Sequence, residues 1–117
     1  MNGSHQCQKG HVVDAAALVD GRLEVRTRGL TSVPPLADPQ RDRGVWNDLE
    51  LIVFEGTAIQ LLNGQVVCVT SNARTTQDQP VRNGEIALVG FHGTVYFRNL
   101  QVRDIDDLPP GIVELAR

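Results

Sequence analysis

The side chains that could do chemistry lie mostly in the second half of this 117-residue chain, beside apolar stretches. His92 is of a type that titrates near neutrality, so it could act as a general base or bind a metal. Arg98 offers a planar fork of five donors, which suits sugar hydroxyls or a carboxylate. Each has a structural alternative: an exposed or bonded histidine, and an arginine in a salt bridge to a neighbouring strand.

Trp46 and Asn99 extend the candidate set for substrate binding. The face of a tryptophan can stack on a pyranose ring, because that ring presents C–H groups to an aromatic surface. Packing in the core or against a hairpin is the commoner role, and it is the alternative for Trp46. Asn99 would bind substrate beside Arg98, but we favour the alternative of a β-bulge, because asparagine tolerates the unusual backbone angles of a bulge.

Glu50 is the carboxylate best suited to acid–base chemistry. On an alternating strand its face also carries Ile52 and Phe54, so we expect the carboxyl group to be partly buried and to hold its proton more readily. Glycoside hydrolysis of the ordinary kind needs two carboxyl groups across the scissile bond. The sequence places no second carboxylate opposite Glu50, so Glu50 and His92 are catalytic candidates without assigned roles.

Composition limits the classes of partner and compartment. The net charge is −3 and the basic residues form no stripe, which argues against nucleic acid. No apolar run is long enough to span a membrane. The N-terminus is polar and lacks the core of a signal peptide, as in a cytoplasmic protein or an exported one whose signal is absent from the chain. No cofactor is indicated, and a divalent metal is left open.

Cysteine usage gives a separate expectation about redox chemistry. The chain has two cysteines, Cys7 and Cys68, and the second falls in an apolar strand. This pattern is more typical of buried or idle thiols than of a disulfide framework.

The chain is expected to form one domain. We divide it into a flexible leader at 1–10, a single β-sandwich domain at 11–108 and a tail at 109–117. The leader shows no hydrophobic periodicity, and the two prolines at 109–110 end the last predicted strand. Valine, leucine and isoleucine supply most of the apolar mass, which favours strands.

Alternation of apolar and polar residues predicts most of the strands. Residues 22–27 are predicted as a half-buried strand, and 11–19 as either a strand or a short helix. Residues 46–56 have one wholly apolar face and one mostly apolar face, so we predict a central strand covered on both sides. Further strands are predicted at 85–89 and 94–105. Many short strands with little helix predict an all-β fold, an antiparallel β-sandwich.

Asn63-Gly64 is the strongest local signal in the chain. Both residues accept positive φ, as a type I′ turn requires, so 57–71 is predicted to form a hairpin. A two-residue turn sets the register of the two strands. The predicted pairs are Leu62 with Gln65, Leu61 with Val66, and Ile59 with Cys68. We expect one core face that carries Ile59, Leu61, Val66 and Cys68.

Four motifs in a fixed order carry a family resemblance. They are Trp46-Asn47 at the start of a strand, Leu62-Asn63-Gly64 at the hairpin, Gly84-Glu85-Ile86-Ala87-Leu88 along a strand, and Phe97-Arg98-Asn99-Leu100 in the last strand. Over 46–105 the chain resembles the C-terminal half of the 3-keto-disaccharide hydrolase domains. The resemblance implies a concanavalin A-like lectin/glucanase sandwich of jelly-roll type. It also implies activity on a 3-keto-glycoside, by hydrolysis or by elimination.

The chain departs from the family pattern after the third motif. Relatives have a glutamine after the leucine and a histidine just beyond it, and these positions fall on Val89 and Phe91 here. His92 comes one residue late, and an offset of one residue reverses the facing of a side chain in a strand. Two functions therefore stay open. One is a glycoside-processing enzyme, and the other is a non-catalytic carbohydrate-binding or assembly module that has lost the family's site.

Fewer residues precede Trp46 than the N-terminal half of the family contains. We therefore expect a truncated sandwich with exposed sheet edges, and exposed edges favour pairing with another chain. The expected partners are a carbohydrate ligand and a second copy, in a homodimer or a larger homo-oligomer that completes the sandwich.

Overall fold

The computed structural model describes residues 12–19, 22–30, 33, 35–81, 88 and 93–108. Its strands are β1 (Val12–Val19), β2 (Arg22–Leu30), β3 (Leu49–Phe54), β4 (Thr57–Leu62) and β5 (Gln65–Arg74). The described residues include no helix. The stretch after residue 11, which the sequence leaves open between strand and helix, is therefore a strand.

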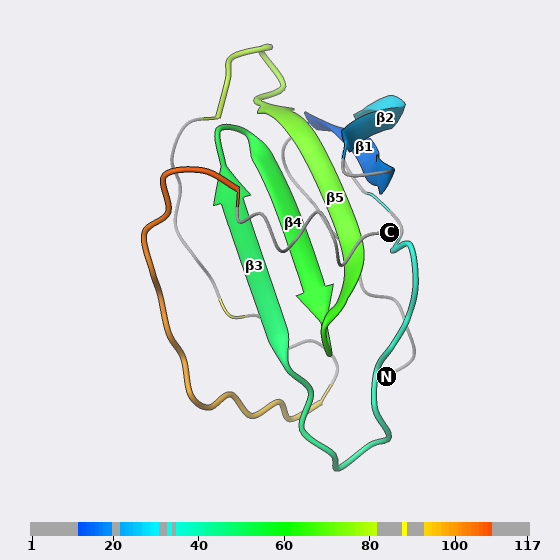
Figure 1. The fold of residues 1–117 in the computed structure, drawn as a ribbon, viewed down its shortest axis with the longest axis vertical. Helices are drawn as coiled ribbons and strands as arrows, with labels where there is room; N and C mark the ends of the chain where they lie inside the picture. Colours follow the sequence, from blue (N-terminus) through cyan, green and yellow to red (C-terminus); the bar gives the residue numbers. More distant parts are fainter. Residues whose placement is uncertain are drawn as a thin grey trace.

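All five strands belong to one antiparallel sheet in the order β2-β1-β5-β4-β3 (Figure 1). Three consecutive strands, β3 to β5, form a meander, and β1 joins it along the far side of β5. The prediction of an all-β, antiparallel fold is confirmed. The described strands account for one sheet of the expected sandwich.

Two-residue turns join the strands of the meander. Asn63 and Gly64 have φ of 52° and 80°, the positive values that the predicted type I′ turn requires. Glu55 and Gly56, with φ of 47° and 80°, form a second two-residue turn, at a position that the sequence analysis placed inside a strand. A Cβ added at Gly64 would meet no atom within 4 Å, so backbone conformation rather than space favours glycine there.

The register of the β4–β5 hairpin follows the prediction near the turn and departs from it further along. The pairs nearest the turn are the predicted ones, Leu62 with Gln65 and Leu61 with Val66. The predicted pair of Ile59 with Cys68 is wrong, because Ile59 pairs with Val69. The strand β5 accommodates one extra residue, Val67, at a β-bulge, which shifts every later pair by one.

Each face of the sheet carries its own hydrophobic cluster. The first contains Ala16, Ile52, Ile59, Leu61 and Val69, with Val66, Ile105 and Leu108 packed against it. The second contains Val13, Val33, Val67 and Cys68, with Ala15, Leu30, Leu62 and Ala73 packed against it. The bulge explains why Cys68 lies in the second cluster and not beside Ile59, as the sequence analysis expected.

Among the described strands, β3 lies at an edge of the sheet, which corrects the prediction of a central strand covered on both sides. On one face, Ile52 is buried in the first cluster and Phe54 is half-buried. On the other face, the wholly apolar row of Leu49, Leu51 and Val53 is exposed. The predicted alternation is therefore present, but only the mixed face is covered.

The stretch 94–105 contains no strand, contrary to the prediction. Asn99 has φ of 56° there, so its predicted unusual backbone conformation is confirmed, although it does not lie in a bulged strand. A left-handed residue interrupts an extended chain, which is a physical reason why the alternation around it does not become a strand. Of the strand predicted at 85–89, only Leu88 is among the described residues, and it is not in a strand.

The side chain of Asn63 ties the β4–β5 turn to the loop that precedes β3. Its Oδ1 accepts a hydrogen bond from the backbone N–H of Asp48 at 2.8 Å. Its Nδ2 donates to the carbonyl of Pro39 and to Oδ1 of Asn47, each at 2.8 Å. The backbone N–H of Asn63 donates to the carbonyl of Asp48 at 2.7 Å. One turn residue thus fixes the chain on both sides of Trp46.

Replacing Asn63 with glycine tests this anchoring. Asn63→Gly keeps a residue that accepts positive φ but removes the three side-chain hydrogen bonds. We expect the free energy of unfolding to fall by about 1–3 kcal/mol, because a hydrogen bond contributes about 1 kcal/mol net. Urea unfolding followed by circular dichroism measures the change.

Glu55→Gly is the matched control, since Glu55 holds the corresponding position of the other turn with φ of 47°. Its side chain makes no hydrogen bond or ion pair among the described residues. We expect its stability to change by less than about 0.5 kcal/mol or to rise, because glycine relieves a left-handed backbone. Equal losses in both variants would mean that the Asn63 side chain anchors nothing.

Candidate functional site

Trp46 and Arg98 come from distant parts of the chain and stack on each other. The guanidinium carbon of Arg98 lies 3.9 Å from the centroid of the Trp46 ring, within the range of a cation–π interaction. Both residues are exposed. Among the described residues, no carboxylate pairs with Arg98 and no group hydrogen-bonds its donors. We call this pair the Trp46–Arg98 platform.

The loop before β3 holds Trp46 by its backbone. Nη1 of Arg41 donates a hydrogen bond to the carbonyl of Trp46 at 2.6 Å, and its Nη2 lies 3.5 Å from Oδ2 of Asp48. The backbone N–H of Arg41 donates to Oδ1 of Asn47 at 2.9 Å. Because Asn47 and Asp48 are also hydrogen-bonded to Asn63, the platform rests on the β4–β5 turn.

The other candidate residues differ in how close they lie to the platform. Asn99 follows Arg98 directly and is exposed. Glu50 is also exposed, so its expected partial burial is wrong, and the reason is that β3 is an edge strand. No hydrogen bond or ion pair in the described part of the chain joins Glu50 to the platform. His92 lies outside the described residues.

A buried carboxylate, Asp14 on β1, was not singled out from the sequence. Its side chain is 2% exposed and is surrounded by donors from two neighbouring strands. The donors are the backbone N–H of Gly29 at 3.1 Å, Nδ2 of Asn72 at 3.2 Å, Nη1 of Arg74 at 3.3 Å and Nη1 of Arg28 at 3.4 Å. The one available sequence signal was an acid within the apolar run 12–19.

Two register shifts in the strand pairing place these donors around the Asp14 carboxylate. In the β1–β2 pairing, the single residue Asp14 lies opposite two residues of β2, and the second of these, Gly29, has φ of 73°. The β1–β5 pairing has a similar shift next to Asp14, where Asn72 has φ of 53°. Bulges of this kind redirect side chains and backbone groups from a regular ladder. The carboxylate therefore joins three strands at one point.

The surroundings of Asp14 keep it ionised. Burial by itself raises the pKa of this carboxyl, but the hydrogen bonds from Gly29, Asn72 and Arg74, with the charge of Arg74, outweigh burial and lower the pKa below its usual 3.8. A carboxylate with a lowered pKa and this many donors is a poor base. Asp14 is therefore a structural anchor.

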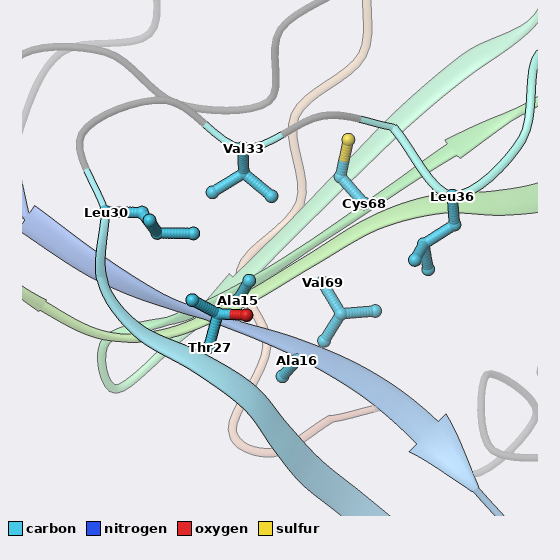
Figure 2. A pocket seen from close by; sticks show the side chains of 8 residues that line it. All are labelled: Ala15, Ala16, Thr27, Leu30, Val33, Leu36, Cys68 and Val69. Carbon is cyan, nitrogen blue, oxygen red and sulfur yellow. The ribbon is translucent and has the colours of Figure 1, made fainter.

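A cavity of about 210 Å³ lies under the loop that follows β2, lined by residues of both hydrophobic clusters (Figure 2). Its lining residues are Ala15, Ala16, Thr27, Leu30, Val33, Leu36, Cys68 and Val69. Apolar side chains dominate this lining, which suits a small apolar group better than sugar hydroxyls.

Cys68 is disulfide-bonded, so the expectation of idle thiols is wrong. The chain's other cysteine, Cys7, lies outside the described residues.

Within the described ranges, no three side chains of His, Cys, Asp or Glu gather in a way that could hold a metal ion. None of these residues belongs to a helix long and apolar enough to cross a membrane.

Comparison with known proteins identifies a family. Residues 2–103 match the family described as the 3-keto-alpha-glucoside-1,2-lyase-like domain. The match covers most of the 117 residues and includes the whole Trp46–Arg98 platform. It also begins well before Trp46, so it extends beyond the span 46–105 that carries the four motifs. No curated protein matches the chain, and no solved structure does.

Asp14→Asn tests the anchor through its pH dependence. Near pH 7 we expect the variant to lose about 2–4 kcal/mol of unfolding free energy, because the amide cannot accept from every donor and the buried negative charge beside Arg74 is removed. A folded-state pKa below 3.8 means that Asp14 stabilises the fold above that pH, and that this contribution disappears as pH falls through the folded-state pKa. The difference in unfolding free energy between Asp14→Asn and the unsubstituted chain should therefore narrow below about pH 4.

Asp78→Asn is the control for this experiment. Asp78 also pairs with Arg74, at 3.4 Å, but its side chain is 87% exposed. Exposed pairs contribute less than about 1 kcal/mol, so we expect a small loss near pH 7. If the difference in unfolding free energy between Asp14→Asn and the unsubstituted chain stayed constant from pH 7 to pH 3, the role of Asp14 as an ionised anchor would be contradicted.

Proposed function

The chain belongs to the 3-keto-alpha-glucoside-1,2-lyase-like family, and we propose that it binds and processes a 3-keto-glycoside at the Trp46–Arg98 platform. The observation that carries this proposal is the stack itself, at 3.9 Å. It presents an exposed aromatic side chain and a cation without a carboxylate partner among the described residues. This is a combination that suits a ring with hydroxyl and carbonyl oxygens.

The reaction class follows from the chemistry of a 3-keto sugar. The ketone at C3 acidifies the hydrogen on C2, so a base can remove that proton. The electron pair of the C2–H bond forms the C1=C2 double bond while the C1–O bond breaks, and the departing aglycone oxygen takes up a proton. Such an elimination needs a base and a donor that stabilises the negative charge on the ketone oxygen.

Residues of the platform are proposed to divide the binding work. Trp46 stacks against the sugar ring, and Arg98 donates hydrogen bonds to the ketone oxygen or to a neighbouring hydroxyl. Asn99 adds a side-chain amide next to Arg98. His92 and Glu50 are the proposed base candidates. Elimination suits this set better than hydrolysis, because hydrolysis requires two facing carboxyl groups.

A second candidate function is a carbohydrate-binding or assembly module without catalysis. The position of Glu50 favours it, because this carboxylate is exposed on an edge strand and makes no contact with the platform among the described residues. In either case the proposed partners are a carbohydrate and a second copy of the chain. The second copy would supply surface that a single sheet leaves uncovered.

Turnover of a chromogenic substrate separates the two functions. We expect a 3-keto-glucoside of p-nitrophenol to release the phenol in the presence of the protein. Elimination should leave a C1=C2–C3=O enone, which absorbs in the ultraviolet, whereas hydrolysis leaves the saturated keto sugar. The unoxidised p-nitrophenyl glucoside is the control and should stay intact. Saturable binding without any release would support the non-catalytic module.

Substitutions in the platform should weaken sugar binding measured by calorimetry. Trp46→Ala removes the stacking face, and Arg98→Gln removes the charge, so we expect roughly tenfold weaker binding for the first and threefold to tenfold for the second. Arg26→Gln is the matched control, because Arg26 is an exposed arginine on β2, at the opposite edge of the sheet. Unchanged affinity in both platform variants would locate the sugar elsewhere.

A further inference from the structure

The row of Leu49, Leu51 and Val53 on β3 is exposed despite being wholly apolar. These side chains are 61%, 49% and 57% exposed, and they follow one another along one face of a single strand. Among the described strands, β3 pairs with β4 alone, so half of its backbone hydrogen-bonding groups face outward. An edge strand of this composition is a ready template for another strand.

We infer that β3 pairs with β3 of a second copy of the chain, in an antiparallel register centred on Leu51. This inference rests on the second-copy part of the proposed function and names the strand and the register that would carry it. The pairing would extend the sheet across a two-fold axis and place the two apolar rows side by side on one face.

The other edge of the sheet is protected against the same pairing. The edge strand β2 carries Glu24, Arg26 and Arg28 in alternation along its length. Charged side chains on an edge strand oppose the approach of another strand, because pairing would desolvate them. The strand β3 has a single charged residue, Glu50, and no lysine or proline. The contrast selects β3 as the associating edge.

The register of the β3–β3 pairing follows from the sheet face on which each side chain lies and from charge. Around a two-fold axis perpendicular to the sheet, side chains of the same face meet, so one residue of β3 pairs directly with its own copy across the axis. Centring on Leu51 places Leu51 opposite the partner's Leu51, and Leu49 opposite the partner's Val53. Centring on Glu50 would place two carboxylates against each other, and centring on Ile52 would place Leu49 opposite the partner's Glu55.

Charge at the two ends of β3 supports the same register. The start of β3 lies beside the platform, where Arg98 has no carboxylate partner among the described residues. The end of β3 is followed by Glu55, which has no cationic partner among them. Antiparallel pairing centred on Leu51 brings the partner's Glu55 opposite Asn47, next to the platform. The two-fold axis makes this complementary contact twice.

This register makes the second copy a contributor to the candidate site. The partner's Glu55 would lie at the edge of the Trp46–Arg98 platform and add the carboxylate that Glu50 does not provide there. Pairing of two six-residue strands covers less surface than a standard stable interface, so we expect a dissociation constant in roughly the micromolar range.

Light scattering over a concentration series tests the association. The chain should approach twice its 12.8 kDa mass at high concentration and dissociate on dilution. Leu51→Lys should keep it monomeric at every concentration, because two ammonium groups would meet on the axis. Leu36→Lys, at a residue 56% exposed away from β3, should leave the association unchanged. Glu55→Gln should raise the dissociation constant roughly threefold to tenfold.

Cysteine cross-linking tests the register independently of the lysine variants. Paired residues in an antiparallel ladder have Cα atoms about 5.5 Å apart, which a disulfide can span. Leu51→Cys should therefore form a covalent dimer with itself under mild oxidation. Val53→Cys should not link with itself, and it should link with Leu49→Cys when the two variants are mixed.

Several outcomes would overturn the inference. A monomer at all concentrations would refute the association, and a dimer unaffected by Leu51→Lys would refute the use of β3. Self-linking at Val53→Cys without linking at Leu51→Cys would refute the register, as would no effect of Glu55→Gln.

Calorimetric titration of a monomeric Leu51→Lys variant with the 3-keto-glucoside separates the inferred β3–β3 dimer from the proposed function. If the unsubstituted chain never associates and the Leu51→Lys variant still binds the sugar, the proposed function stands and only this inference fails.

Discussion

The fold depends on one buried carboxylate more than on any other polar contact in the described structure. Asp14 is 2% exposed and takes donors from β2 and from β5, on both sides of its own strand. A buried charge without partners would be strongly unfavourable, so the strands on either side must bring their donors to this point. The two bulges are the geometric means, because Gly29 and Asn72 leave the regular ladder to reach Asp14.

Local patterns predicted the fold wherever the decisive residues were neighbours in sequence. The Asn63-Gly64 turn and the strand around Ile52 depend on short-range preferences, and both are present. The predictions failed where a distant partner decides the outcome. Nothing in the alternation of β3 shows whether a further strand lies beside it, so its edge position and the exposure of Glu50 were missed. The bulge at Val67 likewise depends on the contacts of β5 with two neighbouring strands.

The candidate site shows the same division between local and distant information. Trp46 and Arg98 could be selected by residue type, but their stacking depends on how the chain after residue 93 runs past the start of β3. The position of Trp46 in turn depends on Asn63, which appears in the sequence only as a turn residue. Its side-chain amide links the β4–β5 turn to the loop before β3. A residue whose backbone conformation suits the turn therefore also positions the candidate binding surface.

The reaction chemistry limits which of these residues can act. A base for the C2 hydrogen must accept a proton near neutral pH, and Asp14 is unsuited because its donors hold it ionised with a lowered pKa. The platform can polarise a ketone and orient a ring, since it offers a cation and an aromatic face. In the proposed function these contributions would bind the substrate but would not remove its proton. In the proposed function the base must therefore be another residue, and the candidates are His92, Glu50 and, in the inferred dimer, the partner's Glu55.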